Sequence, residues 1–509
     1  GVLPSATATS LMQLSEHGGT WVIPGLPGQL SAAHEPGPTA DRIASLLESA
    51  GRRQASVAGP LHPIAEVLAD DLAEPWRRDS SSALELPFGV SGRDALILSL
   101  SSENPPHPNV LVGGAVGQGK SNLLLTLIYG YALRYSPEEL ELYLVDFKQG
   151  LEFKRFDADD AGANWLPHVK VLSLESDLAF GIAILRHLVD EKRRRGSLLA
   201  AAGVSSIDAY RAGGHGTMPR VLLFVDEFHK LFDGQGDDVD EAVALLTDLA
   251  KQGRAFGIHL LLASQTTSGI RSLAAVSDAI FAQFPLRLSL KNTPTESEAI
   301  LSQGNRAAAD LTYRGEVILN RNYGVDPDGS NVRGVVAYAD PASLRDIQVR
   351  LWSRDQQQDP HERPVVFTAT AYAAWHDVHT PQERPADPLN AGIDVWLGRP
   401  IAVTAAPEVH TLRPDVDQAV ALVGPGADVA HSVLRSILLT AIPSLAGNGE
   451  LLLLHSNPNA DNGWLDAVRA HASAHQVPVR DVVGDEVVTL LRDEARHRTL
   501  SSSGPRLVV

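Results

Sequence analysis

Cysteine is absent from the 509 residues of the chain. Its absence excludes disulfides, thiolate zinc sites, iron–sulfur clusters and cysteine nucleophiles, and it fits a reducing compartment. Long apolar runs are missing too. Stretches such as Leu123–Leu133 fall well short of the roughly 18–20 residues that a membrane-spanning helix needs. The chain begins at Gly1 without an export signal, so we expect a trimmed, soluble, cytoplasmic protein that associates with a membrane only through regions or partners outside this sequence.

Positive charge is scarce. Lysine and arginine number 43 against 61 acidic residues, which gives a net charge of −18. An acidic chain is not typical of a nucleic-acid binder, so any such contact must be local. The one dense basic cluster is Lys192-Arg193-Arg194-Arg195, which is either a phosphate-binding patch or a solvated helix end. With 44% hydrophobic and 20% charged residues the composition is that of a globular protein, and the length predicts about three domains.

Between about Pro63 and Pro341, short apolar runs alternate with longer helical stretches. Continuous apolar strands between helices are typical of a parallel sheet that is covered on both faces. We therefore predict an α/β fold with a doubly wound, mostly parallel sheet. The order of Ser136, Pro137 and two acidic residues predicts the start of one of the helices. The strands are predicted at Val110–Val112, Leu142–Val145, Val221–Val225 and His259–Leu262.

The second half of the chain resembles the first at an offset of about 310 residues. Leu422-Val423-Gly424-Pro425 matches Leu111–Gly114, Gly398 matches Gly89, and Pro505-Arg506-Leu507 matches Pro219-Arg220-Val221 after a shorter spacing. Such ordered similarity favours a divergent internal repeat. We predict an N-terminal segment of unknown role (1–55), a complete domain (56–345), a polar linker (346–390) and a truncated second copy (391–509).

One segment matches the phosphate-binding pattern G-x-x-x-x-G-K-[ST] without a mismatch. In such a loop the backbone N–H groups wrap the phosphates, the lysine neutralises their charge, and the serine hydroxyl ligates Mg²⁺. The apolar strand before it and the apolar helix after it are the context that the motif requires. We therefore predict that ATP and Mg²⁺ are bound here. The predicted nucleotide-binding residues are Gly114, Ala115, Val116, Gly117, Gln118, Gly119, Lys120, Ser121 and Asn122.

An apolar run ends in Asp226 and Glu227, about 105 residues after the loop. A buried strand delivers such carboxylates to the sheet edge where α/β proteins bind their ligands. We predict that Asp226, with Ser121, holds Mg²⁺ and that Glu227 polarises the attacking water. Gln265, at the end of another apolar strand, is a candidate sensor of the γ-phosphate or an ordinary strand-end amide.

Two arginines near that strand, Arg254 and Arg287, are candidates for a finger that reaches a neighbouring subunit's nucleotide, although an exposed surface arginine is the commoner case. Asp146-Phe147-Lys148 ends a further strand at the same sheet edge.

The second copy of the domain lacks the residues of the phosphate-binding loop. Pro425, Ala430 and His431 stand at the positions of Gly114, Gly119 and Lys120, and proline removes an N–H donor. We predict that this copy does not hydrolyse ATP.

These motifs together resemble the FtsK/SpoIIIE motor domain, within the HerA-like P-loop ATPases. The resemblance spans about Leu84 to Tyr338 and includes Leu86-Pro87-Phe88-Gly89, Asp146-Phe147-Lys148, Val225-Asp226-Glu227-Phe228 and Arg254–Leu260. It implies a RecA-like fold, a hexameric ring of identical chains and ATP hydrolysis between subunits. The family's Walker lysine and serine, acidic pair and sensor glutamine would correspond to Lys120, Ser121, Asp226, Glu227 and Gln265.

The resemblance leaves two kinds of cargo open. FtsK and SpoIIIE translocate double-stranded DNA, and Val225–Phe228 and Ala263-Ser264-Gln265 are closer to those motors. The type VII secretion ATPases of the EccC branch move proteins and carry tandem, often degenerate copies. The active-then-degenerate layout and the segments Tyr135–Glu139 and Leu166–Val169 resemble that branch. The sequence favours double-stranded DNA as the cargo, with protein secretion or assembly as the alternative.

Overall fold

The computed structural model divides the chain into two compact units, residues 1–61 and 62–509, and each is described by itself. The residues that it describes are 11–15, 18–22, 30–32, 59–102, 105–148, 152–174, 178–233, 236–266, 280–326, 329–358, 360–368, 393–398, 403, 408–412, 427–447, 449–455, 463–483, 486–489, 492 and 506–508. In the first unit, β1 (Leu11–Ser15), β2 (Gly18–Val22) and β3 (Leu30–Ala32) pair in an antiparallel sheet. The sequence predicts no role for this segment.

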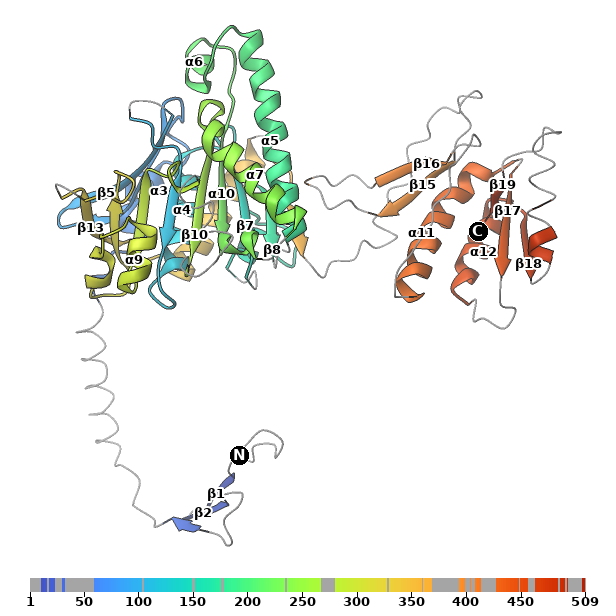
Figure 1. Cartoon of the computed structure of the whole chain (residues 1–509), viewed down its shortest axis with the longest axis horizontal. Coiled ribbons are helices and arrows are strands. Elements are labelled where there is room, and N and C mark those ends of the chain that lie inside the picture. The colour runs from blue at the N-terminus through green and yellow to red at the C-terminus, as the bar shows by residue number, and fades with distance from the viewer. Residues whose placement is uncertain are drawn as a thin grey trace. The chain divides into compact units, whose positions relative to one another are not determined.

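The second unit is built around an eleven-stranded sheet with the order β14-β8-β7-β9-β10-β6-β11-β12-β13-β4-β5 (Figure 1). From β14 to β11 every neighbouring pair is parallel. The predicted doubly wound, mostly parallel sheet is therefore confirmed. Its parallel strands are β6 (Val110–Gly113), β7 (Leu140–Asp146), β8 (Val169–Leu174), β9 (Arg220–Asp226), β10 (Ile258–Ser264), β11 (Leu286–Leu290) and β14 (Val365–Thr368).

The other end of the sheet is antiparallel. It consists of β12 (Glu316–Asn320), β13 (Asn331–Val336), β4 (Ala83–Ser91) and β5 (Asp94–Ser101). Residues alternate between buried and accessible along β4 and β5, as in strands that face the core on one side only. In contrast, every residue of β6, β9 and β10 is buried, because helices cover both faces of the parallel part.

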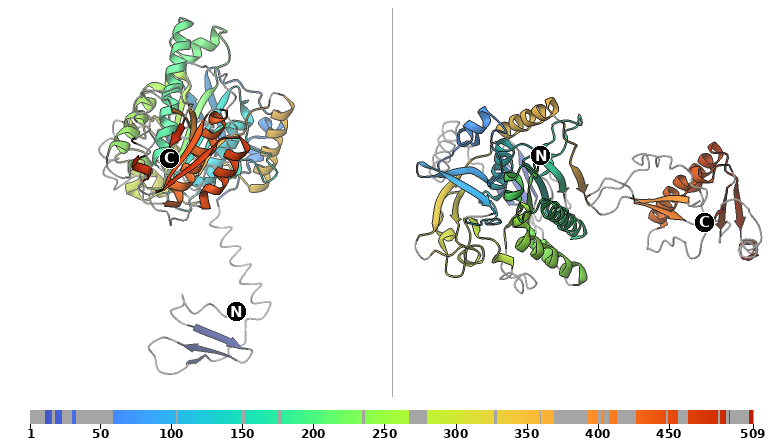
Figure 2. Two further views of the ribbon diagram at one scale, coloured as in Figure 1. Left: turned by 90° about the vertical axis from the view of Figure 1, so that its right-hand side faces the viewer. Right: turned by 90° about the horizontal axis from the view of Figure 1, so that it is seen from above.

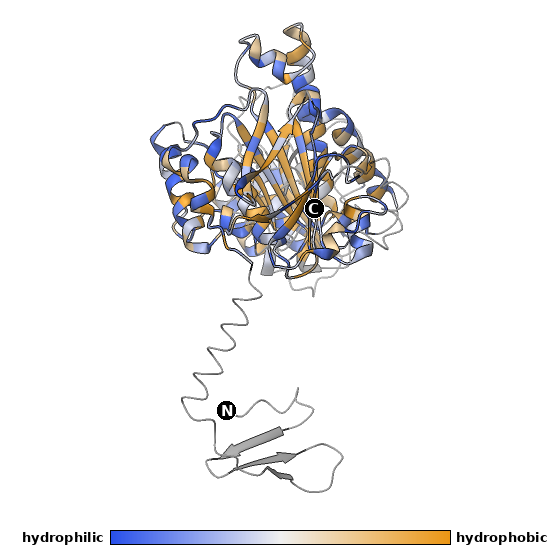
Figure 3. Cartoon of the chain, turned by 90° about the vertical axis from the view of Figure 1, so that its left-hand side faces the viewer, coloured by the Kyte–Doolittle hydropathy of each residue, from blue (hydrophilic) through white to orange (hydrophobic). Residues whose placement is uncertain are grey.

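Two apolar clusters, one on each face of the sheet, attach the long helices (Figure 2). One cluster contains α4 (Lys120–Arg134) and α10 (Pro341–Gln357), and the other contains α5 (Leu178–Ala201) and α7 (Asp237–Gln252). Apolar residues concentrate in the strands and polar ones on the outer helix surfaces (Figure 3). None of the helices within the described ranges is long and apolar enough to cross a membrane. The short helices are α2 (Ile64–Val67), α3 (Ala69–Ala73), α6 (Ile207–Ala212) and α9 (Pro294–Ile300).

Two local expectations differ from the structure. Ser136 starts a turn, not a helix: its carbonyl accepts from Glu139 and Leu140 at 2.9 and 3.0 Å, and β7 begins at once. Too few residues lie between α4 and β7 for a helix to propagate. The predicted boundary at 345 falls inside α10, and β14 then pairs with β8, so the structure of the first domain extends to Thr368. Much of the surface of α10 faces solvent, so its composition is polar, and the sequence therefore indicated a linker in place of a helix.

The fold of the first domain recurs in the last part of the chain. There β17 (Glu450–His455) lies between β18 (Val479–Val483) and β19 (Arg506–Val508), and all three are parallel. The same order is seen in β8-β7-β9. The register also recurs, because Arg506 pairs with Glu450, the first residue of β17, and Arg220 pairs with Leu140, the first residue of β7.

The hairpins of the two copies share a distortion. In β4 the register shifts between Pro87 and Gly89. The second hairpin, β15 (Ile393–Gly398) with β16 (Glu408–Leu412), shifts between Trp396 and Gly398, which are the matching residues. Each hairpin precedes a long apolar helix, α4 in one copy and α11 (Ala427–Leu445) in the other. A second RecA-like domain therefore follows the first.

Candidate active site

The predicted phosphate-binding loop joins β6 to α4. The strand is fully buried, and α4 begins at Lys120. Gly117 and Gly119 have φ angles of 79° and 106°, in the left-handed region that favours glycine. A Cβ at Gly114 would lie 2.9 Å from the Leu290 side chain, so this glycine allows close packing of the loop on β11. Val116, at the loop tip, is 77% exposed. The loop thus has the strand–turn–helix context that its motif requires.

The predicted acidic pair lies beside the loop lysine. Asp226 ends the buried strand β9, and Glu227 follows in a left-handed conformation with φ 53°. Such a backbone is strained for a non-glycine residue, and strain of this kind gathers at functional sites. The Glu227 N–H donates to Asp226 Oδ1 at 2.9 Å. Lys120 Nζ forms ion pairs with Asp226 and, at 2.8 Å, with Glu227 Oε1.

A third carboxyl group, Asp146, belongs to the same cluster. It ends β7 directly opposite Asp226 in the parallel register. Burial raises the pKa of Asp146 to about 6, and the negative charges of Asp226 and Glu227 add to the rise; the Lys148 N–H, which donates to Asp146 Oδ1 at 2.8 Å, opposes it. Burial also raises the pKa of Asp226, against the effect of Lys120. With three carboxyl groups facing one ammonium group, the site favours an additional cation.

The residues here fit a magnesium ion that arrives with a nucleotide. Hydroxyl and carboxylate oxygens, as in Ser121 and Asp226, are the hard ligands that Mg²⁺ prefers. Mg²⁺ is usually bound by one or two protein oxygens together with phosphates and water. Among the described residues, no group of three or more His, Asp or Glu side chains is arranged to hold a metal on its own.

Two other predicted residues have different surroundings. Gln265 follows β10, and its backbone N–H donates to Glu227 Oε2 at 3.2 Å, so the structure brings it to the acidic pair. The Asn122 side chain is engaged elsewhere. It donates to the Ala337 carbonyl at 2.8 Å and accepts from the Ala339 N–H at 2.9 Å, which attaches α4 to the segment after β13. These bonds explain how the Asn122 side chain holds α4 in place, and its role in nucleotide binding stays a prediction.

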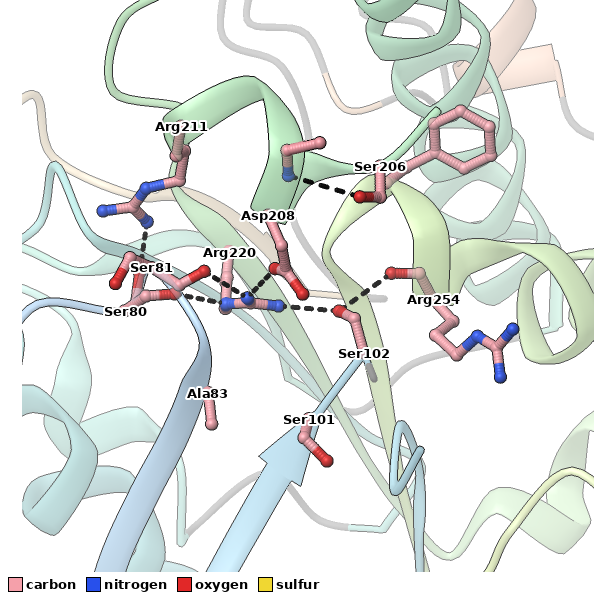
Figure 4. A network of polar contacts seen from close by, with 12 residues as sticks. Ser80, Ser81, Ala83, Ser101, Ser102, Ser206, Asp208, Arg211, Arg220 and Arg254 are labelled. Atoms are coloured by element: carbon pink, nitrogen blue, oxygen red, sulfur yellow. Dashed lines mark hydrogen bonds and ion pairs between the residues drawn. The ribbon is translucent and has the colours of Figure 1, made fainter. Parts of the chain in front are cut away.

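The two candidate finger arginines differ in exposure. Arg287 is buried, and its guanidinium donates to the backbone carbonyls of Phe281, Phe284, Ile300 and Leu301 at 2.7–2.9 Å. It cannot reach a neighbouring subunit, and that expectation for Arg287 is wrong. Arg254 is exposed on the short helix Gly253–Phe256, and its side chain points away from the polar network drawn in Figure 4.

A buried polar network fixes the backbone from which Arg254 projects. Arg220 is fully buried and paired with Asp208, and it donates to the Ser80 carbonyl at 2.6 Å and to Ser102 Oγ at 2.9 Å (Figure 4). The Ser102 hydroxyl in turn donates to the Arg254 carbonyl at 3.1 Å. The network therefore connects α6, the start of β4 and the helix that carries Arg254.

Replacing Arg220 by methionine is expected to lower the free energy of unfolding by about 3–5 kcal/mol, because Asp208 and several polar groups lose their partner. Urea unfolding followed by circular dichroism measures the loss. Arg193→Met is the control, because Arg193 is exposed and pairs only with Asp190 on the same helix. Equal midpoints for the two variants would contradict the structural role of Arg220.

Two residues of the site were not predicted from the sequence. The His229 ring lies 2.9 Å from Ser264 Oγ and 3.4 Å from Glu227 Oε2, measured from Nδ1. His229 stands two residues after Glu227, and the short helix Phe228–Phe232 turns its ring back toward the carboxylate. The sequence signal that could have identified His229 is its position shortly after an acidic pair. Ser264, at the end of an apolar strand, carried no such signal.

The matching site of the second copy is different. Ala430 and His431 lie in α11, and the His431 ring stacks on Trp464 with centroids 4.8 Å apart and planes 7° apart. Pro425 lies outside the described residues. Instead of a flexible ammonium group, the second copy presents two stacked aromatic rings at the position of the lysine.

A buried parallel sheet, a glycine loop entering a helix, and a lysine facing two strand-end acids define a P-loop ATPase of the RecA-like class. The FtsK/SpoIIIE family model matches residues 67–269 of the sequence. Among curated proteins, the chain is 31% identical over 269 residues to the type VII secretion system protein EssC of Staphylococcus aureus, and this match covers 51% of this chain and 17% of EssC. It is also 28% identical over 252 residues to the ESX secretion system protein YukB of Bacillus subtilis, and this match covers 48% of this chain and 16% of YukB.

The chain thus spans about a sixth of the length of these relatives. Among solved structures, the cytoplasmic domain of the Thermomonospora curvata type VII secretion ATPase EccC has a TM-score of 0.61 at 20% identity, and the match covers 89% of this chain and 60% of that one. The EccC fragment with ATPases 2 and 3 and a signal sequence peptide has a TM-score of 0.52 at 17% identity, covering 86% of this chain and 76% of that one. These similarities confirm the tandem RecA-like fold.

Proposed function

We propose that the first domain hydrolyses ATP and works as a motor for moving protein substrates in a type VII secretion system. The observation that carries the proposal is the convergence of Lys120, Asp226 and Glu227 at the phosphate-binding loop of an FtsK/SpoIIIE-family domain. In this chain a complete set of hydrolytic groups meets at the carboxyl edge of the sheet.

Each group has a separate task. The loop N–H groups and the dipole of α4 bind the phosphates, and Lys120 neutralises the charge on the β- and γ-phosphates. Glu227 orients the attacking water and accepts its proton. When bound with ATP, Mg²⁺ supplies charge neutralisation at the phosphates, and Ser121 and Asp226 are the residues that would hold it. Gln265 and Arg254 remain proposals as the γ-phosphate sensor and as a finger from a neighbouring copy in a hexameric ring.

The cargo proposal replaces the expectation of double-stranded DNA. The relatives that share the domain are named as type VII secretion proteins, which supports protein as the cargo. Charge supports it too, because the basic cluster that sequence analysis singled out is occupied by internal partners. Within it, Lys192 pairs with Asp248 at 2.6 Å, Arg193 with Asp190 at 2.7 Å, Arg194 with Glu191 at 2.6 Å, and buried Arg195 with Glu191 at 2.7 Å.

The second domain is proposed as a docking or regulatory module without ATPase activity. His431 cannot supply the charge of a lysine, and its ring is stacked on Trp464. A domain that keeps the fold of the motor but not its charge can present the same sheet edge to a different ligand. This proposal accounts for an active copy followed by a degenerate one.

Duplex DNA is expected to leave ATP turnover unchanged, within about twofold, from about 20 to 200 mM salt. A DNA motor would instead show strong stimulation that falls steeply as salt rises, because phosphate contacts release counterions. The measurement is steady-state ATPase activity with and without a duplex, with Lys120→Ala as the background control. Salt-sensitive stimulation by DNA would overturn the protein-cargo proposal but leave the ATPase assignment intact.

A further inference from the structure

Glu227 is held by groups from three different elements. Its Oε1 faces Lys120 Nζ at 2.8 Å, and its Oε2 accepts from the Gln265 N–H at 3.2 Å and lies 3.4 Å from His229 Nδ1. The proposed function gives Lys120 a different partner during turnover, because its ammonium group then neutralises the phosphates. The Gln265 N–H and the His229 ring are left to orient the carboxylate.

The hydrogen bonds of Ser264 determine which ring nitrogen of His229 carries the proton. The Ser264 hydroxyl donates to the Thr266 carbonyl at 2.7 Å, and it accepts from the Thr266 N–H at 3.2 Å. A hydroxyl has one hydrogen, so its oxygen can only accept at the 2.9 Å contact with His229 Nδ1. Nδ1 therefore carries the hydrogen and donates it to Ser264 Oγ, and Glu227 Oε2 lies 3.4 Å from the same nitrogen.

The surroundings also keep the ring neutral. Burial lowers the pKa of His229, and the nearby charges of Glu227 and Asp233 only partly oppose this. The His229 side chain is 17% exposed, while that of Glu227 is 8% exposed. A neutral, Nδ1-protonated ring lies beside the carboxylate without the imidazolium charge that would hold Glu227 in an ion pair.

We propose that His229 is a positioning residue for Glu227. The ring is held by its Nδ1–H to Ser264 Oγ at the end of β10, the strand that leads into Gln265, and from there it lies against Glu227 Oε2 and fixes the orientation of the carboxylate. His229 touches neither phosphate nor water in this scheme and acts through Glu227 alone. The proposal rests on the proposed ATP hydrolysis at this site and deepens it.

The test compares two amides at one position in the full chain. His229→Asn places an amide N–H near the position of Nδ1, whereas His229→Gln places it near that of Nε2. With single-turnover and steady-state assays of MgATP hydrolysis, we expect kcat to fall about tenfold in His229→Ala and His229→Gln, and KM to stay within twofold. His229→Asn should recover at least half of the wild-type kcat. His215→Ala, at an exposed histidine, is the matched control.

A second comparison separates positioning from general damage. In a Glu227→Gln background the carboxylate acceptor is gone, so adding His229→Ala should cause no further loss of hydrolysis. Four results would each overturn the role of His229. They are a wild-type kcat in His229→Ala, equal kcat values in His229→Asn and His229→Gln, a change in KM that parallels the change in kcat, and a further loss of hydrolysis when His229→Ala is added to Glu227→Gln. If the wild-type chain does not hydrolyse ATP, or if Lys120→Ala hydrolyses it normally, the proposed function fails instead.

Discussion

Replacing Lys120 by alanine is expected to reduce ATP turnover by at least about 100-fold, since a charge that stabilises the transferring phosphoryl group is removed. In the structure the Lys120 ammonium group is almost fully buried between Asp226 and Glu227, so a lysine elsewhere on the protein surface cannot take over its role. We also expect nucleotide binding to fall below detection, because the remaining carboxylates repel the phosphates. Steady-state turnover and titration with a fluorescent ATP analogue measure the two effects.

Lys251→Ala is the matched control for this variant. Lys251 is exposed in the last turn of α7, so its removal should change neither turnover nor binding. A thermal unfolding scan of Lys120→Ala shows whether the loss of the buried pairs has affected folding. Turnover close to that of the wild-type chain in a folded Lys120→Ala protein would contradict the assignment of the active copy.

Replacing Glu227 by glutamine is expected to lower turnover by about 10²–10⁴-fold while ATP still binds, because an amide cannot accept a proton from the attacking water. The substitution keeps the size of the side chain, so its contact with the Gln265 N–H can persist through the amide oxygen. The ATP-bound state should accumulate. The measurement is a filter-binding assay for bound, unhydrolysed ATP beside the turnover assay.

Glu241→Gln provides the control, since Glu241 lies on the surface of α7 and pairs with Arg186 away from the loop. Its turnover should match that of the wild-type chain. If Glu227→Gln hydrolyses ATP at the normal rate, the water-orienting role belongs to another group. Asp146, which lies opposite Asp226 in the same cluster, would then be the first to examine.

The parallel strands of the fold could be predicted because their information is local. The apolar runs at Val110, Leu142, Val221 and His259 all lie in strands, and the loop between β6 and α4 follows from the glycine pattern alone. Parallel strands end at a common edge, so the meeting of Lys120 with the acidic pair also followed from their order in the sequence.

Contacts between distant segments could not be predicted in this way. The burial of Arg287 depends on four carbonyl groups, and two of them belong to α9 and the residue after it. The pairing of Lys192 in α5 depends on Asp248 in α7. His229 reaches Glu227 only through a short helix whose geometry no periodicity indicates. In each case the partner of a polar side chain is set by tertiary structure, which composition does not reveal.

The most direct test of the central claim is the number of nucleotides bound per chain, measured by isothermal titration calorimetry with Mg²⁺ and a non-hydrolysable ATP analogue. We predict one nucleotide per chain, bound at the loop of residues 114–121, and none after Lys120→Ala. A stoichiometry of two, or binding that survives Lys120→Ala, would contradict the claim that the first domain holds the one working site and that the stacked His431 and Trp464 mark a site without nucleotide.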